Sequence, residues 1–272
     1  MAQPVAGTLA YEVRDLIVYS LRLLTPCLYL LFFLPGPDPI GPAFKRPKGR
    51  ILGVSIAVYA VASEIGSLLI QLVSTIADRF GFAVYSPSSA TPTHPVAIAL
   101  YLVNLAVLPA FWEELLFRGY ILGALKRYGN FFALITSSLL FALLHGNPYQ
   151  AVNAFMLGLA MGYFALLGGS IYPGMVVHFI NNFMVGVYSL LPDTDLVHLV
   201  DTIFTIGCVL VLGVLFLLYC YRLVKGRERL LPETVPCPVQ GGQKALTFLS
   251  SVTLPVVIVV YLYHILLCFT PK

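Results

Sequence analysis

Long apolar stretches recur along this whole chain and constrain its fold more than any other feature. They lie at 16–34, 51–77, 96–125, 131–146, 150–168, 171–190, 200–221 and 246–268. A helix needs roughly 20 apolar residues to cross a hydrocarbon core, where backbone polar groups have no water to bind and must bond within the helix. The pattern therefore predicts an all-α, polytopic transmembrane helix bundle of about eight helices.

Composition agrees with a lipid environment. Hydrophobic residues make up 59% of the chain and charged residues 10%, whereas soluble domains carry roughly 25% charged residues. Short connectors leave no room for a separate soluble domain, so residues 1–272 are expected to form a single integral, multi-pass membrane domain. The net charge of +4 comes from short basic clusters between apolar runs, and therefore no nucleic-acid partner is expected.

Charges in the connectors predict how the helices are oriented. Lys45 and Arg46 follow the first run, Lys126 and Arg127 follow the third, and the seventh connector is also basic. The alternate connectors carry few cations, and one of them contains Asp193. Because basic connectors stay in the cytoplasm, we expect both termini on the other side, provided that every run crosses completely.

Ionisable residues inside the third run are the first candidates for function. The run reads VLPAFWEELLFRGYILGAL and holds Glu113, Glu114 and Arg118, with Pro109 expected to break or kink the helix. A charge at the centre of a membrane helix costs at least about 2.5–3.5 kcal/mol. Glu114 and Arg118 share a helix face, which predicts a buried ion pair that largely neutralises itself. Glu113 points about 100° away, so its partner must come from another helix.

Two further runs supply polar groups that could meet Glu113. The fourth ends in SLLFALLHGNP, which places His145 one turn after Phe141. The sixth begins IYPGMVVHFINNF, in which His178 and Asn182 share a face and Asn181 is a geometric alternative. A carboxylate that takes a proton from water, an imidazole that positions it, and His or Asn donors for an oxyanion together fit a hydrolytic site.

These motifs resemble those of the CAAX prenyl endopeptidase and bacteriocin-processing family, also called the Abi family, of intramembrane glutamic peptidases. The family pattern EExxxR is matched at 113–118, FxxxH at 141–145 and HxxxN at 178–182, in the family's order. The resemblance places a catalytic core at residues 95–190. The segments on either side match no motif of the family.

The resemblance implies roles for the polar residues. Glu113 and His145 would activate the hydrolytic water, and His178 and Asn182 would form the oxyanion hole, with the predicted ion pair in support. It implies an intramembrane endopeptidase without a cofactor. Its substrate would be a membrane-anchored peptide or protein, prenylated or not, cleaved in CAAX-type C-terminal processing or at a bacteriocin leader or sorting signal.

Three other functions stay open on the sequence. A zinc-dependent membrane peptidase could use Glu113, His145 and His178 as ligands with water in the fourth position, although the chain has no HExxH motif. A proton-coupled transporter could use the same residues as a relay, but its halves should then show internal similarity, and none is apparent. A non-catalytic membrane scaffold or immunity protein would keep the core without hydrolysis.

Overall fold

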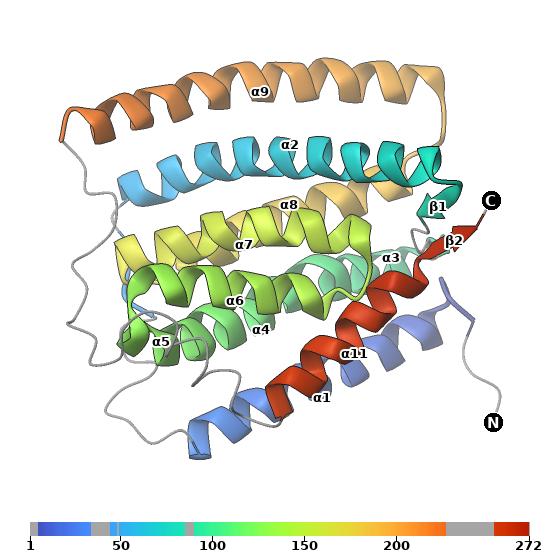
Figure 1. Ribbon diagram of the computed structural model, residues 1–272. Coiled ribbons are helices and arrows are strands. Elements are labelled where there is room, and N and C mark those ends of the chain that lie inside the picture. Colours follow the sequence, from blue (N-terminus) through green and yellow to red (C-terminus); the bar gives the residue numbers. More distant parts are fainter. Residues whose placement is uncertain (1–4, 34–43, 48, 85–89, 227–252, 272) are drawn as a thin grey trace.

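The structure is a computed structural model that describes residues 5–33, 44–47, 49–84, 90–226 and 253–271. It confirms an all-α fold (Figure 1). The helices are α1 (Leu9–Phe33), α2 (Gly49–Arg79), a continuous helical segment from Pro95 to Tyr128, α6 (Asn130–Leu144), α7 (Pro148–Gly168), α8 (Tyr172–Leu190), α9 (Asp195–Val224) and α11 (Thr253–Leu267).

Four of the described helices are long and apolar enough to cross a membrane: α2, the segment at 95–128, α7 and α9. The protein is therefore an integral, multi-pass membrane protein. α6 and the described part of α11 are apolar but shorter, so the predicted count of about eight transmembrane helices is only loosely supported. The eighth predicted run, at 246–268, begins outside the described residues.

The segment at 95–128 is helical throughout but changes its winding. It comprises α3 (Pro95–Leu102), the π-helical turn η1 (Val103–Val107), α4 (Leu108–Glu114), the π-helical stretch η2 (Leu115–Ile121), α5 (Leu122–Leu125) and the 3₁₀ turn η3 (Lys126–Tyr128). A break or a kink was expected at Pro109, and the helix is not broken there. The N–H of Leu108 bonds to the carbonyl of Val103, five residues back, and this wider turn accommodates the proline that follows.

Successive helices run in alternating directions (Figure 1). α2 packs against both α7 and α9, α6 packs against α7, and α8 packs against η1 and α4. Figure 1 shows α9 at one edge of the bundle beside α2, with α1 and α11 at the opposite edge. α1 packs against α3, α4 and η2, which makes it a neighbour of both glutamates.

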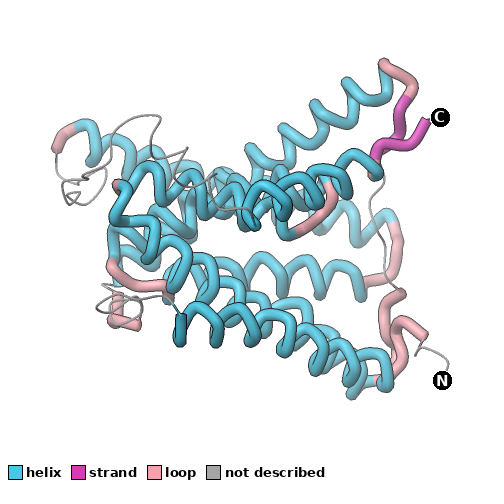
Figure 2. Tube along the Cα trace, turned by 60° about the horizontal axis from the view of Figure 1, so that its bottom comes forward, coloured by secondary structure: helices cyan, strands magenta, loops and turns pink. Residues whose placement is uncertain are grey.

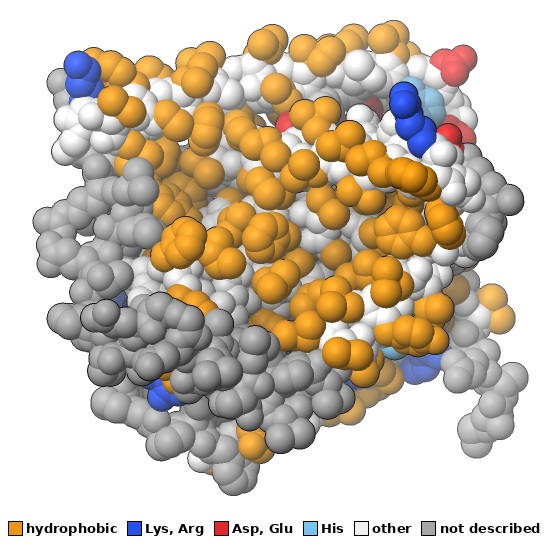
Figure 3. Space-filling view, in the orientation of Figure 1, with side chains coloured by type: hydrophobic (Ala, Val, Ile, Leu, Met, Phe, Trp, Pro, Cys, Tyr) orange, Lys and Arg blue, Asp and Glu red, His pale blue; other side chains and the backbone are white. Residues whose placement is uncertain are grey.

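The described part of the face seen in Figure 3 is largely apolar, as expected where lipid is the solvent. A short feature not expected from the sequence is an antiparallel strand pair, β1 (Phe82–Val84) and β2 (Phe269–Pro271). Figure 2 shows these strands at the C-terminal end of the described chain. They connect the end of α11 to the segment that follows α2.

Candidate active site

The predicted ion pair lies at the centre of the bundle. Arg118 Nη1 donates to Glu114 Oε1 at 2.8 Å, and Glu114 is completely buried. Arg118 Nη2 also donates to the carbonyl of Gly158 on α7 at 3.3 Å, and the guanidinium lies 4.2 Å from the ring centroid of Phe141. The pair therefore joins η2 to α6 and α7, in addition to neutralising two charges.

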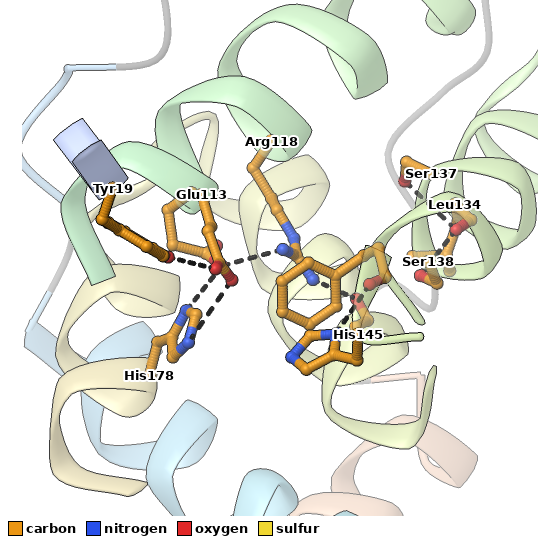
Figure 4. Close-up of polar contacts among 11 residues, drawn as sticks. Tyr19, Glu113, Arg118, Leu134, Ser137, Ser138, His145 and His178 are labelled. Carbon is orange, nitrogen blue, oxygen red and sulfur yellow. Dashed lines mark hydrogen bonds and ion pairs between the residues drawn. The ribbon is translucent and has the colours of Figure 1, made fainter. Parts of the chain in front are cut away.

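His178 connects this ion pair to the second glutamate (Figure 4). Its Nδ1 lies 3.2 Å from Glu114 Oε1, and its Nε2 lies 3.9 Å from Glu113 Oε2. A carboxylate only accepts hydrogen bonds, so Nδ1 must be the donor toward Glu114. The expectation that Glu114 and Arg118 mainly satisfy each other is incomplete, because the same oxygen of Glu114 also holds His178.

Close approach of α8 to Glu114 depends on a glycine. A Cβ atom at Gly174 would lie 2.5 Å from Glu114 Oε2. A side chain at this position would force the Glu114 carboxylate, which Arg118 and His178 hold, to shift, so glycine lets α8 lie close against it. Gly174 precedes His178 by four residues, on the same face of α8.

Glu113 receives its partner from another helix, as expected, but the partner comes from a segment without motifs. The hydroxyl of Tyr19 on α1 donates to Glu113 Oε1 (Figure 4). Glu113 Oε2 is buried and has no hydrogen-bond partner in the described part of the chain. Tyr19 is one of 16 tyrosines, and nothing in the sequence distinguishes it from the others.

His145 follows directly after α6 and faces the same region. Its Nδ1 lies 2.9 Å from the carbonyl of Phe141, which leaves Nε2 on the opposite side of the ring. The Phe141 ring packs edge-on against both His145 and His178, at centroid distances of 5.1 and 5.8 Å. Within the described residues His145 makes no direct hydrogen bond to Glu113, but the two side chains line the same cavity.

Asn182 is engaged with its neighbours. Its Nδ2 donates to the carbonyl of Leu105 in η1 at 2.9 Å, and its Oδ1 accepts from Asn181 Nδ2 at 2.8 Å. An amide nitrogen carries two protons, so one N–H of Asn182 remains for another acceptor. Both asparagines line the cavity, and the choice between them stays a prediction.

These residues surround one polar cavity of about 450 Å³. The four residues predicted to be catalytic, Glu113, His145, His178 and Asn182, all line it. They come from α4, the end of α6, and α8, so the fold brings together motifs that are far apart in the sequence. Glu12 and Asp15, near the beginning of α1, also line this cavity.

A second, largely apolar cavity of about 800 Å³ adjoins the first. Both cavities are lined by Tyr19, Glu113 and His145. The second extends between α1, η2, α6 and α11, and its apolar lining includes Leu23, Pro26, Leu116, Phe117, Ile121 and Leu140. The polar cavity and this apolar cavity, called the apolar groove below, therefore share Glu113 as a lining residue.

The positions of the acids and histidines also bear on the zinc alternative. Across the ranges that the structure describes, no group of three His, Cys, Asp or Glu side chains is placed to hold a metal ion. His178 Nδ1 is directed to Glu114, and Glu113 Oε1 accepts from Tyr19. The arrangement gives no support to the proposed ligand set of Glu113, His145 and His178.

Comparison with known families adds an independent finding. Residues 95–184 match the family described as Type II CAAX prenyl endopeptidase Rce1-like. No curated protein and no solved structure matches the chain significantly. The matched residues include all three motifs and every side chain predicted to be catalytic. Residues 95–184 of this membrane protein are therefore similar to the CAAX-type endopeptidases, which confirms the resemblance drawn from its motifs.

Proposed function

We propose that this protein is a glutamic intramembrane peptidase that hydrolyses a peptide bond in a lipid-anchored peptide or protein, with Glu113 as the general base. The observation that carries the proposal is the free oxygen of Glu113. Oε2 is buried and has no partner among the described residues, and the Glu113 side chain lines the same cavity as both histidines. A carboxylate oxygen in this setting can take a proton from water.

The distance between Glu113 and His178 suits a single bound water. Glu113 Oε2 and His178 Nε2 lie 3.9 Å apart, and two hydrogen bonds of about 2.8 Å that meet at one water oxygen span such a separation. His145 Nε2 is the remaining group that can orient this water from the other side of the cavity. Water held in this way attacks the peptide carbonyl as Glu113 accepts its proton. Glu113 then gives this proton to the leaving nitrogen as the intermediate collapses and the C–N bond breaks.

The oxyanion of the tetrahedral intermediate would be stabilised by His178 and Asn182. Because Nδ1 of His178 donates to Glu114, Nε2 can donate as well only when the ring is a cation. Asn182 contributes its free N–H. Donors fixed in a buried site stabilise developing charge strongly because they need no reorganisation during the reaction.

The apolar cavity indicates the class of substrate. Glu113 is among its lining residues, and it runs between α1, η2 and α6, so a lipid chain could lie in it while the adjoining peptide reaches the polar cavity. This arrangement favours a prenylated or otherwise lipid-anchored peptide over an unmodified leader peptide or sorting signal. The scissile bond would then lie next to Glu113.

The test uses the purified full-length protein in nanodiscs with one peptide in two forms, prenylated and unmodified. We expect cleavage of the prenylated form, and loss of about 10²–10⁴-fold in kcat for Glu113→Gln, with a comparable loss for His178→Ala. Glu64→Gln is the matched control, because Glu64 is a helix acid that lines a different groove between α2, α8 and α9. Equal cleavage by wild type and Glu113→Gln would rule out the mechanism.

A chelator separates the glutamate mechanism from the zinc alternative. We expect activity to survive dialysis against a strong chelator, with no metal bound in stoichiometric amount by elemental analysis. Loss of activity that added zinc restores would favour the zinc peptidase instead. Accumulation of the peptide inside proteoliposomes without cleavage would indicate a transporter.

A further inference from the structure

α1 lies outside the residues that match the family, yet it reaches the centre of the candidate site. Its Tyr19 donates a hydrogen bond to Glu113 Oε1 and lines both the polar cavity and the apolar groove. A helix that served only as a lipid-facing support would not need a polar side chain there. The contact therefore calls for a chemical explanation.

The position of Tyr19 is fixed by a buried contact two turns earlier on α1. Asn104 in η1 donates through Nδ2 to the backbone carbonyl of Glu12 at 2.9 Å and to its carboxylate at 3.0 Å. Glu12 is only 2% exposed. Glu12 and Tyr19 are seven residues apart and share a helix face, so the bond that anchors Glu12 also directs Tyr19 toward Glu113.

The two oxygens of Glu113 are consequently in different environments. Oε1 accepts from the Tyr19 hydroxyl, whereas Oε2 has no partner among the described residues and lies 3.9 Å from His178 Nε2. Without the tyrosine, the carboxylate could rotate about its last side-chain bond, because that torsion is broad. A hydrogen bond to one oxygen removes this freedom and keeps the other on the side of His178.

We infer that Tyr19 is a positioning residue that holds Glu113 Oε1, so that Oε2 alone meets the hydrolytic water. This inference rests on the proposed function, because it assigns a role only if Glu113 is the base. The reaction geometry would then depend on α1 as well as on the three motifs. Catalysis is sensitive to such placement, because a displacement of about 1 Å can cost 10²-fold in rate.

The test compares Tyr19→Phe with Tyr163→Phe in the same nanodisc assay. Tyr163 is a fitting control because its hydroxyl forms a hydrogen bond of 2.7 Å with Tyr219, between α7 and α9 and outside both cavities. We expect Tyr19→Phe to lower kcat by about tenfold to a hundredfold, the range of one hydrogen bond to a charged group. We expect the KM and melting temperature of Tyr19→Phe to match those of Tyr163→Phe. The kcat of Tyr163→Phe should match that of the wild type.

Chemical rescue separates positioning from space filling. Tyr19→Ala opens a space beside the two cavities, and phenol should restore part of its kcat, whereas toluene, which has the same shape without the hydroxyl, should not. Equal rescue by phenol and toluene, or wild-type kcat for Tyr19→Phe, overturns the inference. If Glu113→Gln is inactive while Tyr19→Phe is fully active, the inference about Tyr19 fails and the proposed function stands. If Glu113→Gln is fully active, both fail.

Discussion

α7 and α9 are both long apolar helices, but they are used in opposite ways. In the most apolar 18-residue window of α7, 50% of the residues are buried inside the protein, whereas in α9 the share is 6%. α9 is the more apolar of the two by composition. Lipid tails are as apolar as leucine side chains, so hydrophobicity alone gives a helix no reason to enter the protein.

Small and polar residues explain why α7 is the buried one. A Cβ atom at Gly158 would lie 3.1 Å from Ser138 Cβ, and one at Gly162 would lie 2.7 Å from a methyl group of Leu134. These glycines allow α6 to approach closely, and the carbonyl of Gly158 accepts from Arg118. In α9, a Cβ at Gly207 or Gly213 would meet nothing within 4 Å. Close packing and polar contacts therefore determine which helices of this protein are buried.

The largest expected difference in stability is between removing a buried cation and removing an exposed one. Arg118→Met removes the arginine partner of Glu114 and leaves the buried carboxylate with His178 as its remaining partner, which should lower the free energy of unfolding by about 3–5 kcal/mol and abolish activity. Lys225→Met, at the exposed end of α9, should change the free energy of unfolding by less than about 0.5 kcal/mol. Denaturant titration in detergent measures both, and similar losses for the two variants would contradict the comparison.

A pair of phenylalanines tests packing without charge. Phe164 on α7 is 1% exposed and Phe204 on α9 is 54% exposed. Phe164→Ala should cost about 3–5 kcal/mol, because a cavity remains in a packed interior. Phe204→Ala should cost far less, because lipid fills the space. The same unfolding titration applies, and a Phe204→Ala loss as large as that of Phe164→Ala would show that α9 is packed against protein in the membrane.

A pair of glycines gives the smallest effect and the sharpest contrast. Gly174→Ala would place a methyl group 2.5 Å from Glu114 Oε2, and such overpacking should cost about 1–3 kcal/mol. It should also reduce kcat, because Glu114 holds His178. Gly213→Ala has open space and should be neutral or stabilising by up to about 1 kcal/mol, because alanine favours a helix. Destabilisation by Gly213→Ala would mean that another surface packs there.

Much of the fold and part of the site could be predicted from local patterns. Helix positions followed from apolar runs, and the Glu114–Arg118 pair followed from four-residue spacing, since both are properties of a single helix. The continuation of the helix through Pro109 could not be predicted, because it depends on the π-helical turn before it. The bond between Glu114 and His178 was also missed, because it joins helices whose relative rotation is a tertiary property.

The sequence by itself determined that the chain is a multi-pass helical membrane protein and which ionisable residues needed an explanation, because the solvation rules of a bilayer act on each helix separately. Its three motifs also indicated the resemblance that the family match at residues 95–184 supports. Only the tertiary structure decided that Glu113, His145, His178 and Asn182 share one cavity, and that Glu113 is held by Tyr19. The reason is geometric: contacts between helices depend on their depth, rotation and closeness of approach, and no local spacing specifies these.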